Sequence, residues 1–511
     1  METFAKLLEN FSINWYKAYL EMSNAEWDFY IDSTDKNLKK MSKFQDNYSN
    51  LFKDENIYNK FKNIDKNILN KHEQKQLKNI LKDFEEELLT GDDLKNLREK
   101  ENKIAQKYNS YIPKIDGKEV TKAEITKILQ SEPNPDIRKK AYEANLLGGD
   151  LIAEDLKEFA KMRNSFACKK GFSNYFEYKL TEDYEVSLND LTVLLDDVYN
   201  KSKETIKDIL IKKQNELKNF FKVDELKPYH YGFLTGENPE KEVNNCFENK
   251  EQILEISKKA YKDMGWDVDK LLEEKKITLD LFPRKGKNTH GFCFDIDAGL
   301  DTRILANLTN NTISLYTLNH EMGHCVYTLG ISRELPFIDR HTYPAMTEAV
   351  AMMMGDIQKR ENILSDIVPA ELLEKFKQTF REDEAMFISK SLTIINFEKQ
   401  MYENPEQDLK KLWHDLKIKY QMRSENEEAD NGWACIPHYL SHPAYYQNYF
   451  RATLIKAQMY SFLGNLTSNS KTAEILNEKL FKYGTSMEEN ELIEMFTGKK
   501  LSVDSFIKSL L

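Results

Sequence analysis

Two histidines and a glutamate stand close together in the segment LNHEMGHCVY, which covers residues 318–327. His320 and His324 are four residues apart, so on an α-helix their imidazoles project from one face and can reach a single metal ion. Glu321 directly follows the first histidine and can accept a proton from a water molecule that the metal activates. This HExxH pattern predicts a zinc site that hydrolyses peptide bonds.

The HExxH pattern is rare enough in this composition to carry weight. The chain has 9 histidines against 85 aspartates and glutamates. About 0.03 matches would therefore arise by chance, even if aspartate counted as glutamate. The alternative is a pair of histidines that share a helix face without binding a metal, and the composition makes this the weaker interpretation.

A catalytic zinc ion needs a third protein ligand and one open position. The HExxHxxGxxH pattern fails, because Tyr327 and Gly330 stand where glycine and histidine are required. Glu348 follows the second histidine by 24 residues and lies at the start of a predicted helix, which is a rigid support for a ligand. Glu334 and Asp339 are closer in sequence but fall in a predicted loop. We therefore predict Glu348 as the third ligand, with a favourable interaction of its carboxylate with the helix dipole as the alternative.

Two further clusters have side chains suited to binding a substrate. His290 in NTHGFCF stands beside a predicted strand, and the edge of such a strand can pair with an extended peptide backbone. The segment IPHYLSHPAYYQNYF supplies imidazole and phenol donors, namely His438, His442, Tyr445, Tyr446 and Tyr449. Donors of this kind can stabilise the oxyanion that forms during peptide hydrolysis. An aromatic core stripe is an equally good interpretation of this segment from the residues alone.

The elements that must position these residues are predicted to be mainly helical. Only 18 glycines and 12 prolines interrupt a 511-residue chain that is rich in lysine, glutamate and leucine. Up to about residue 110, apolar residues recur every three or four positions, as in amphipathic helices. The helix that carries the HExxH pattern is predicted to end near Gly330, and a helix resumes at AMTEAVAMMMGDIQKR.

Strands are predicted only just before the HExxH helix. HGFCFDID and DTRILANL are alternating or apolar runs, and AGL can form the turn between them. Asp116–Gly117 and the segment 133–135 are predicted turns that connect helices. No low-complexity linker or internal repeat separates these segments, which favours one continuous architecture.

Charge and cysteine content narrow the classes of partner and compartment. The formal net charge of −11 argues against nucleic acid, because phosphate binding needs a basic face. Five cysteines without a CxxC pair are more typical of a reducing compartment than of a disulfide framework. METFAKLLENFSINWYKAYLEM carries charges throughout, unlike a signal peptide, and no uncharged apolar run reaches the roughly 18 residues of a membrane span. We expect a cytoplasmic protein that binds neither nucleic acid nor membranes.

Several segments besides HEMGH resemble the peptidyl-dipeptidase A (angiotensin-converting enzyme) family and the related thimet oligopeptidase and oligoendopeptidase group. They are NAEWDFYIDSTDKN near the N-terminus, FACKKGFSNYFEYKL around residue 170 and DTRI at 301–304, so the likeness extends from residue 20 to about 455. The resemblance implies an almost entirely helical fold, in which two lobes flank a deep central channel and a small β-sheet lies next to the active site.

The resemblance also implies roles for single residues. Glu348 has the spacing of the family's zinc glutamate, and His290 has that of a histidine that binds the substrate backbone. YYQNYF resembles the family's paired tyrosines, with Tyr449 as the oxyanion donor and Tyr446 as a substrate contact. His438 resembles the oligopeptidase histidine that assists the transition state.

Three positions depart from the family pattern. Met352 stands where an aspartate supports a zinc histidine, so another group must accept the imidazole N–H. Asn448 replaces an arginine linked to chloride activation, which argues against chloride dependence. Pro437 falls near the position of a lysine that anchors a substrate carboxylate, which favours oligopeptide cleavage over strict dipeptide release.

We therefore predict a mainly α-helical metallopeptidase over residues 1–511 that hydrolyses short peptides, as an oligopeptidase or peptidyl-dipeptidase, with one Zn²⁺ per chain. Residues 1–130 would form a helical lid part, 280–360 the zinc-binding core and 361–511 a C-terminal helical part that completes the site. The assigned residues are Glu321, Tyr449 and His438 for catalysis, His290 and Tyr446 for substrate, and His320, His324 and Glu348 for the metal.

Two alternatives remain open at this point. A metal-dependent carboxypeptidase of similar helical shape is compatible with DTRI and with the HExGH form, although its HES and GxxQDxHW patterns are not evident. A protein that binds peptides without cleaving them is favoured by Met352. The intact Glu321 opposes it, because a binding protein does not need the general base.

Overall fold

The structure of the chain is a computed structural model and describes residues 3–89, 91–233, 238–288 and 290–510. Helices account for 70% and strands for 3% of it, which confirms the mainly α fold class. The chain divides into two compact units. Unit 1 comprises residues 1–91, 242–377 and 452–502, and unit 2 comprises residues 92–241, 378–451 and 503–511.

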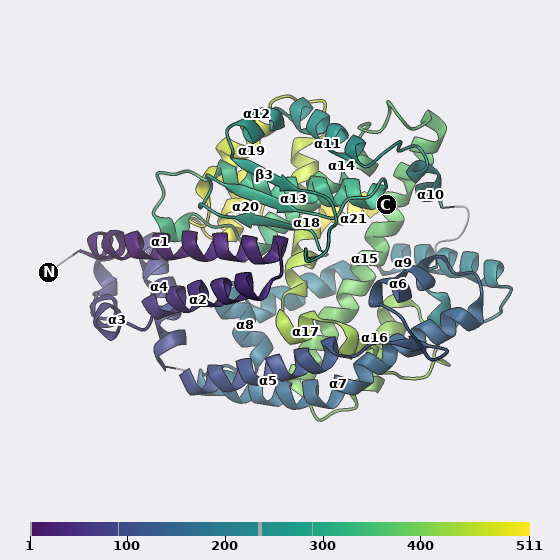
Figure 1. Cartoon of the computed structure of the whole chain (residues 1–511), viewed down its shortest axis with the longest axis horizontal. Helices are drawn as coiled ribbons and strands as arrows, with labels where there is room; N and C mark the ends of the chain where they lie inside the picture. The colour runs from purple at the N-terminus through teal and green to yellow at the C-terminus, as the bar shows by residue number, and fades with distance from the viewer. Residues whose placement is uncertain (1–2, 90, 234–237, 289, 511) are drawn as a thin grey trace. The chain divides into compact units, whose positions relative to one another are not determined.

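Unit 1 begins with four helices whose aromatic side chains share one core. The side chains of Thr3 and Thr34 accept hydrogen bonds from the first turns of α1 and α2, which fixes where these helices begin. α1 and α2 lie side by side (Figure 1). The core beneath them is built from Phe11, Trp15 and Phe84 among others. The bounds are α1 Phe4–Ile31, α2 Asp35–Leu51, α3 Glu55–Lys62 and α4 Lys71–Leu89.

The remaining helices of unit 1 include the two that carry the predicted metal ligands. They are α11 Glu251–Met264, α12 Val268–Glu273, α13 Thr312–Gly330, α14 Pro344–Arg360, α19 Thr472–Lys479 and α20 Glu489–Thr497. The predicted end of the HExxH helix at Gly330 is confirmed. The chain also passes from one unit to the other directly after Gly91, the first residue of α5 (Gly91–Asn109), and within α10 Pro239–Asn244, α15 Ala370–Glu403 and α18 Tyr446–Leu463.

α13 and α14 pack very closely because a glycine stands at their contact. A Cβ atom on Gly323 would lie 2.8 Å from the Cα atom of Ala351 and 3.2 Å from Cγ of Met354. Real Cβ atoms do not approach a backbone carbon so closely, so the glycine is what permits this approach. The HExxH face of α13 is thereby held against the first turns of α14.

A three-stranded sheet precedes α13 in the chain. Its order is β3-β5-β4, with β3 (Ile277–Asp280) parallel to β5 (Thr302–Leu305) and β4 (Phe292–Asp295) antiparallel to β5. The two predicted strands are confirmed, and Gly299 at φ 91° makes the predicted turn between them. The strand β3 was not predicted, although Ile277, Leu279 and Leu281 alternate in KKITLDLFP.

Among the described residues of unit 2, the strands form one hairpin and the other regular elements are helices. Asp116 and Gly117, at φ 51° and 78°, form the two-residue turn between β1 (Lys114–Ile115) and β2 (Lys118–Glu119). The predicted turn therefore joins two short strands as well as the helices beyond them. The helices are α5 Gly91–Asn109, α6 Lys122–Ser131, α7 Pro135–Lys169, α8 Tyr175–Asp183, α9 Leu188–Phe221, α16 Leu409–Gln421, α17 His438–Ser441 and α21 Asp504–Leu510. Within the described ranges, no helix is long and apolar enough to cross a membrane.

Candidate metal centre

Three predicted ligands come together where α13 packs against α14 in unit 1. The Nε2 atoms of His320 and His324 are 3.2 Å apart. One carboxylate oxygen of Glu348 lies 3.5 Å from Nε2 of His320 and 4.0 Å from Nε2 of His324. One ligand atom from each of the three residues lies within 4.8 Å of the others. The two histidines of α13 and Glu348 near the start of α14 therefore surround one point.

The donor set and its spacing fit a zinc ion. Imidazole nitrogens and carboxylate oxygens bind Zn²⁺ at about 2.0–2.2 Å in tetrahedral geometry, which places neighbouring ligand atoms roughly 3.4 Å apart. The observed separations of 3.2, 3.5 and 4.0 Å bracket that value. Two imidazoles and one carboxylate also leave a fourth position for water or substrate, as a catalytic site requires.

The electrostatics of the cluster favour binding of a cation. Burial, and then repulsion by His324, lowers the pKa of His320 well below its usual range. Burial lowers the pKa of His324 to about 4. Both imidazoles are therefore neutral near pH 7 and can offer a nitrogen lone pair to a metal. The negative charge of Glu348, which is only 8% exposed, then lacks a compensating charge from these histidines.

Glu321 lies beside this cluster and is buried. Burial and the charge of Glu348 raise the pKa of Glu321 to about 8, while a hydrogen bond from the backbone N–H of Cys293 acts in the opposite direction. A cation held by the three ligands would favour the carboxylate form and lower this pKa. The group is thus suited to exchange protons near neutral pH.

The edge strand β4 passes next to Glu321. A Cβ atom on Gly291 would lie 3.3 Å from Oε1 of Glu321 and 2.8 Å from Cγ2 of Thr317, so glycine leaves space for the carboxylate. His290 precedes this glycine, and its exposed side chain lies next to Asn288, whose carboxamide oxygen accepts a hydrogen bond from the His290 backbone N–H at 2.9 Å. The segment that carries His290 and leads into β4 therefore lies beside the predicted general base.

The aromatic segment predicted to contact the substrate gathers its side chains within unit 2. The ring of His438 lies 4.9 Å from that of Tyr446 and 6.1 Å from that of Tyr449, and the two tyrosine rings are 5.5 Å apart. Burial, and then the nearby His442 and Lys390, lower the pKa of His438 to about 4. His438 is therefore neutral near pH 7 and can donate one N–H without carrying a charge.

The two other candidates for the third ligand, Asp339 and Glu334, are not grouped with the two histidines. The buried carboxylate of Asp339 accepts a 2.6 Å hydrogen bond from Gln76 and lies 3.0 Å from Nε2 of His72. Glu334 is exposed. The structure brings neither residue into the group formed by the two histidines and Glu348.

Two residues that contact the histidines were not predicted from the sequence. Thr347 places its hydroxyl oxygen 2.7 Å from Nδ1 of His324. Tyr316 stacks on His320 with ring centroids 5.8 Å apart and an interplanar angle of 25°. Tyr316 stands four residues before His320, so helical periodicity was a signal for it. Thr347 has no such signal, because it lies on another helix.

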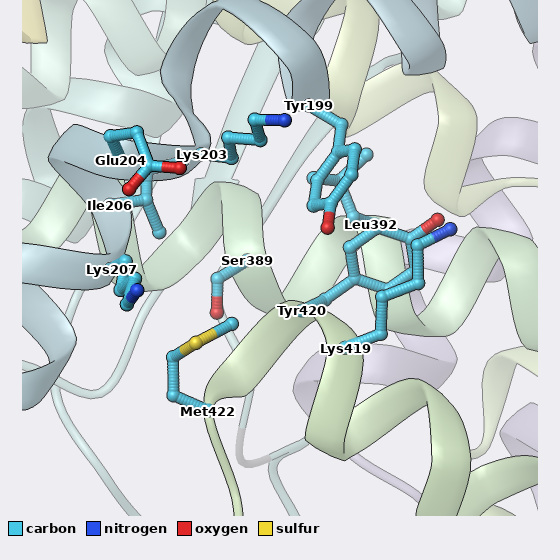
Figure 2. A pocket seen from close by; sticks show the side chains of 10 residues that line it. All are labelled: Tyr199, Lys203, Glu204, Ile206, Lys207, Ser389, Leu392, Lys419, Tyr420 and Met422. Carbon is cyan, nitrogen blue, oxygen red and sulfur yellow. The ribbon is translucent and has the colours of Figure 1, made fainter.

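A cavity of about 300 Å³ lies in unit 2 (Figure 2). Residues of α9, α15 and α16 line it, including Tyr199, Lys203, Lys207, Lys419 and Tyr420. The three lysines are exposed, and Lys419 lies over both tyrosine rings. None of the predicted metal or substrate residues lines this cavity.

Known proteins with sequences similar to this chain indicate its family. The model of peptidase family M3 matches residues 128–510, a range that contains every residue assigned to the site. The chain belongs to peptidase family M3. This M3 chain is 24% identical over 352 residues to oligopeptidase PepF of Bacillus subtilis (strain 168). The match covers 65% of this chain and 49% of the relative, so it spans about half of the relative's length.

M3 membership makes the earlier resemblance more specific. M3 is a metallopeptidase family that includes the thimet oligopeptidase group. That half of the predicted resemblance is therefore confirmed. The likeness to peptidyl-dipeptidase A stays a prediction.

Proposed function

We propose that this M3 chain is a zinc-dependent oligopeptidase that hydrolyses peptide bonds in short peptides. The observation that carries the proposal is the convergence of His320, His324 and Glu348 within 4.8 Å. Membership of family M3 supports the same reaction class. The alternative of a binding protein without activity is disfavoured by the buried carboxylate of Glu321 beside this cluster, since binding alone does not need it.

The three ligands would hold Zn²⁺, and the chain's other groups handle the substrate and the protons. Bound zinc polarises a carbonyl group and activates water. Glu321 accepts the proton released when water attacks and delivers it to the leaving amine. The Cys293 N–H holds the Glu321 carboxylate, and Gly291 leaves the space that it occupies.

An extended peptide would pair with β4. This strand is bonded to β5 on one side and forms the edge of the sheet among the described strands. Such an edge offers backbone groups to an added strand. His290, two residues before β4, would contact the peptide backbone, and Tyr446 would contact the substrate. Tyr449 and His438 would donate hydrogen bonds to the oxyanion, as the family resemblance implies.

Incubation of the purified chain with a mixture of short peptides, with and without a chelator, tests this function. We expect cleavage that stops with the chelator and returns when Zn²⁺ is added. Mass spectrometry of the products distinguishes the modes: internal fragments support an oligopeptidase, dipeptides a peptidyl-dipeptidase and single residues the carboxypeptidase alternative. Peptides that are retained but remain intact would overturn the proposal in favour of a binding protein.

A further inference from the structure

A side-chain hydrogen bond between His324 and Thr347 joins α13 to α14. The Nδ1 atom of His324 lies 2.7 Å from Oγ1 of Thr347, within normal hydrogen-bond range. The other ring nitrogen, Nε2, is the atom that faces His320 and Glu348. One ring nitrogen of His324 therefore contacts Thr347, and the other faces His320 and Glu348.

The contact with Thr347 is compatible with metal binding at Nε2 of His324 when the hydroxyl acts as the acceptor. A neutral imidazole has one N–H and one lone pair, on different nitrogens. If Nδ1–H donates to the Thr347 hydroxyl oxygen, the lone pair stands on Nε2, where Glu348 supplies the neighbouring ligand oxygen. The reverse arrangement, with the hydroxyl donating to Nδ1, would put the hydrogen on Nε2 and block metal binding there.

His320 has no equivalent support. Its Nδ1 atom is buried without a hydrogen-bond partner in the part of the chain that the structure describes. Met352, at the position of the family's supporting aspartate, has a thioether that is at best a weak acceptor. The ring instead stacks on Tyr316, and Gly355 makes room for that tyrosine, since a Cβ there would lie 2.7 Å from its ring. Packing therefore orients His320, whereas a hydrogen bond orients His324.

We propose that Thr347 is a positioning residue for zinc, which fixes the ring orientation of His324, accepts its Nδ1–H and so raises the affinity of the site for the metal. The inference rests on the proposed function, because it assumes that His324 is a ligand. Histidine ligands usually donate their second N–H to a carboxylate, carbonyl or water, and loss of such a partner costs about 10–100-fold in metal affinity or activity. In this chain the acceptor of the second N–H of His324 is the neutral hydroxyl of Thr347, which lies on the neighbouring helix α14.

Zinc affinity of the metal-free protein tests the role of Thr347 without relying on activity. We expect Thr347→Val, which keeps the shape but removes the acceptor, to bind Zn²⁺ about 10–100-fold more weakly in competition with a chromophoric chelator. Thr347→Ser should restore most of the affinity. Thr328→Val is the matched control, because it removes a buried threonine hydroxyl from α13 and should bind zinc as the wild type does.

A second measurement separates positioning from general loss of structure. The thermal midpoint of metal-free Thr347→Val should stay close to that of the wild type. At saturating zinc its kcat should fall more than its KM rises, because the substrate-binding strand is untouched. If Thr347→Val does not fold, Thr347→Ala replaces it with the same expectation.

Equal zinc affinity of a folded Thr347→Val or Thr347→Ala variant and the wild type would overturn the inference and leave the proposed function standing. The same holds if Thr347→Ser fails to restore the affinity. A wild-type chain that binds no zinc, or binds it and cleaves no peptide, would instead overturn the proposed function.

Discussion

The carboxylate of Glu321 accepts a hydrogen bond from the backbone N–H of Cys293, a residue of the edge strand β4. The strand proposed to receive the substrate and the proposed general base are thereby connected directly. The same connection places Gly291 against the Glu321 carboxylate. A peptide that pairs with β4 would lie beside the group that exchanges protons with it.

Replacement of Glu321 by glutamine should abolish hydrolysis but leave the metal bound. The amide oxygen can still accept the Cys293 N–H, but it cannot take up a proton, so we expect kcat to fall by about 100-fold or more. A quenched fluorescent peptide measures the rate, and elemental analysis measures zinc. Glu334→Gln, in an exposed loop position, is the matched control and should retain activity. Retained activity in Glu321→Gln would refute the mechanism.

Glu348→Ala should lose zinc, whereas Glu334→Ala should retain it. Loss of a residue that hydrogen-bonds to a metal ligand typically lowers metal affinity by about 10–100-fold, and loss of the ligand itself should lower zinc affinity more than this. The zinc-to-protein ratio after dialysis against a weak chelator is the measurement. Unchanged stoichiometry in Glu348→Ala would remove Glu348 from the ligand set, and loss of zinc in Glu334→Ala would bring back the loop candidate.

Tyr449→Phe and Tyr446→Phe should separate in their kinetics. Loss of an oxyanion donor costs about 100–1,000-fold in kcat, so Tyr449→Phe should show this loss with little change in KM. Tyr446→Phe should mainly raise KM, because its proposed contact is with the substrate. The rings of Tyr446 and Tyr449 are 5.5 Å apart, so either substitution can also disturb their packing. The thermal midpoint of each variant measures this effect on stability. A fall in kcat for Tyr446→Phe alone would reverse the two assignments.

Glu398 should make the stability of the protein fall as pH rises. This carboxyl is 1% exposed, and burial raises its pKa to about 8 from a usual value near 4.5. The folded state therefore binds the proton more tightly than the unfolded state. The resulting stabilisation is complete below about pH 4.5 and is lost as pH rises through about 8, with a slope of at most about 1.4 kcal/mol per pH unit.

Glu398→Gln removes this titration but keeps an oxygen for the 2.8 Å hydrogen bond from the Ala444 N–H. Urea unfolding at about pH 5 and about pH 8 should show that the variant gains stability relative to the wild type at the higher pH. Glu403→Gln, at an exposed position on the same helix, is the control and should follow the wild type. A parallel pH dependence of Glu398→Gln and wild type would contradict the prediction.

Gly323→Ala should weaken the metal site by separating α13 from α14. The new Cβ would lie 2.8 Å from the Cα of Ala351, so a helix must move. Overpacking costs about 1–3 kcal/mol, which exceeds the gain of about 1 kcal/mol in helix propensity. We expect a lower free energy of unfolding together with weaker zinc binding. Wild-type zinc affinity would show that the close approach at Gly323 does not set the ligand geometry.

The sequence alone determined the features that depend on local geometry. His320 and His324 share a face because helical periodicity acts over four residues. The β4–β5 pair was predictable because the two strands are neighbours in the chain and a glycine turn joins them. The end of α13 at Gly330 followed from the same short-range pattern.

Only the tertiary structure decided the features that depend on packing between distant segments. β3 pairs in parallel with β5, and that pairing joins strands more than 20 residues apart in the chain. The partner of His324 is Thr347 because α14 packs on α13 at Gly323, and no periodicity relates the two positions in the chain. A spacing pattern identifies residues that one helix presents together. Which side chain of a second helix meets them depends on how closely the two helices pack, and here a single missing Cβ sets that distance.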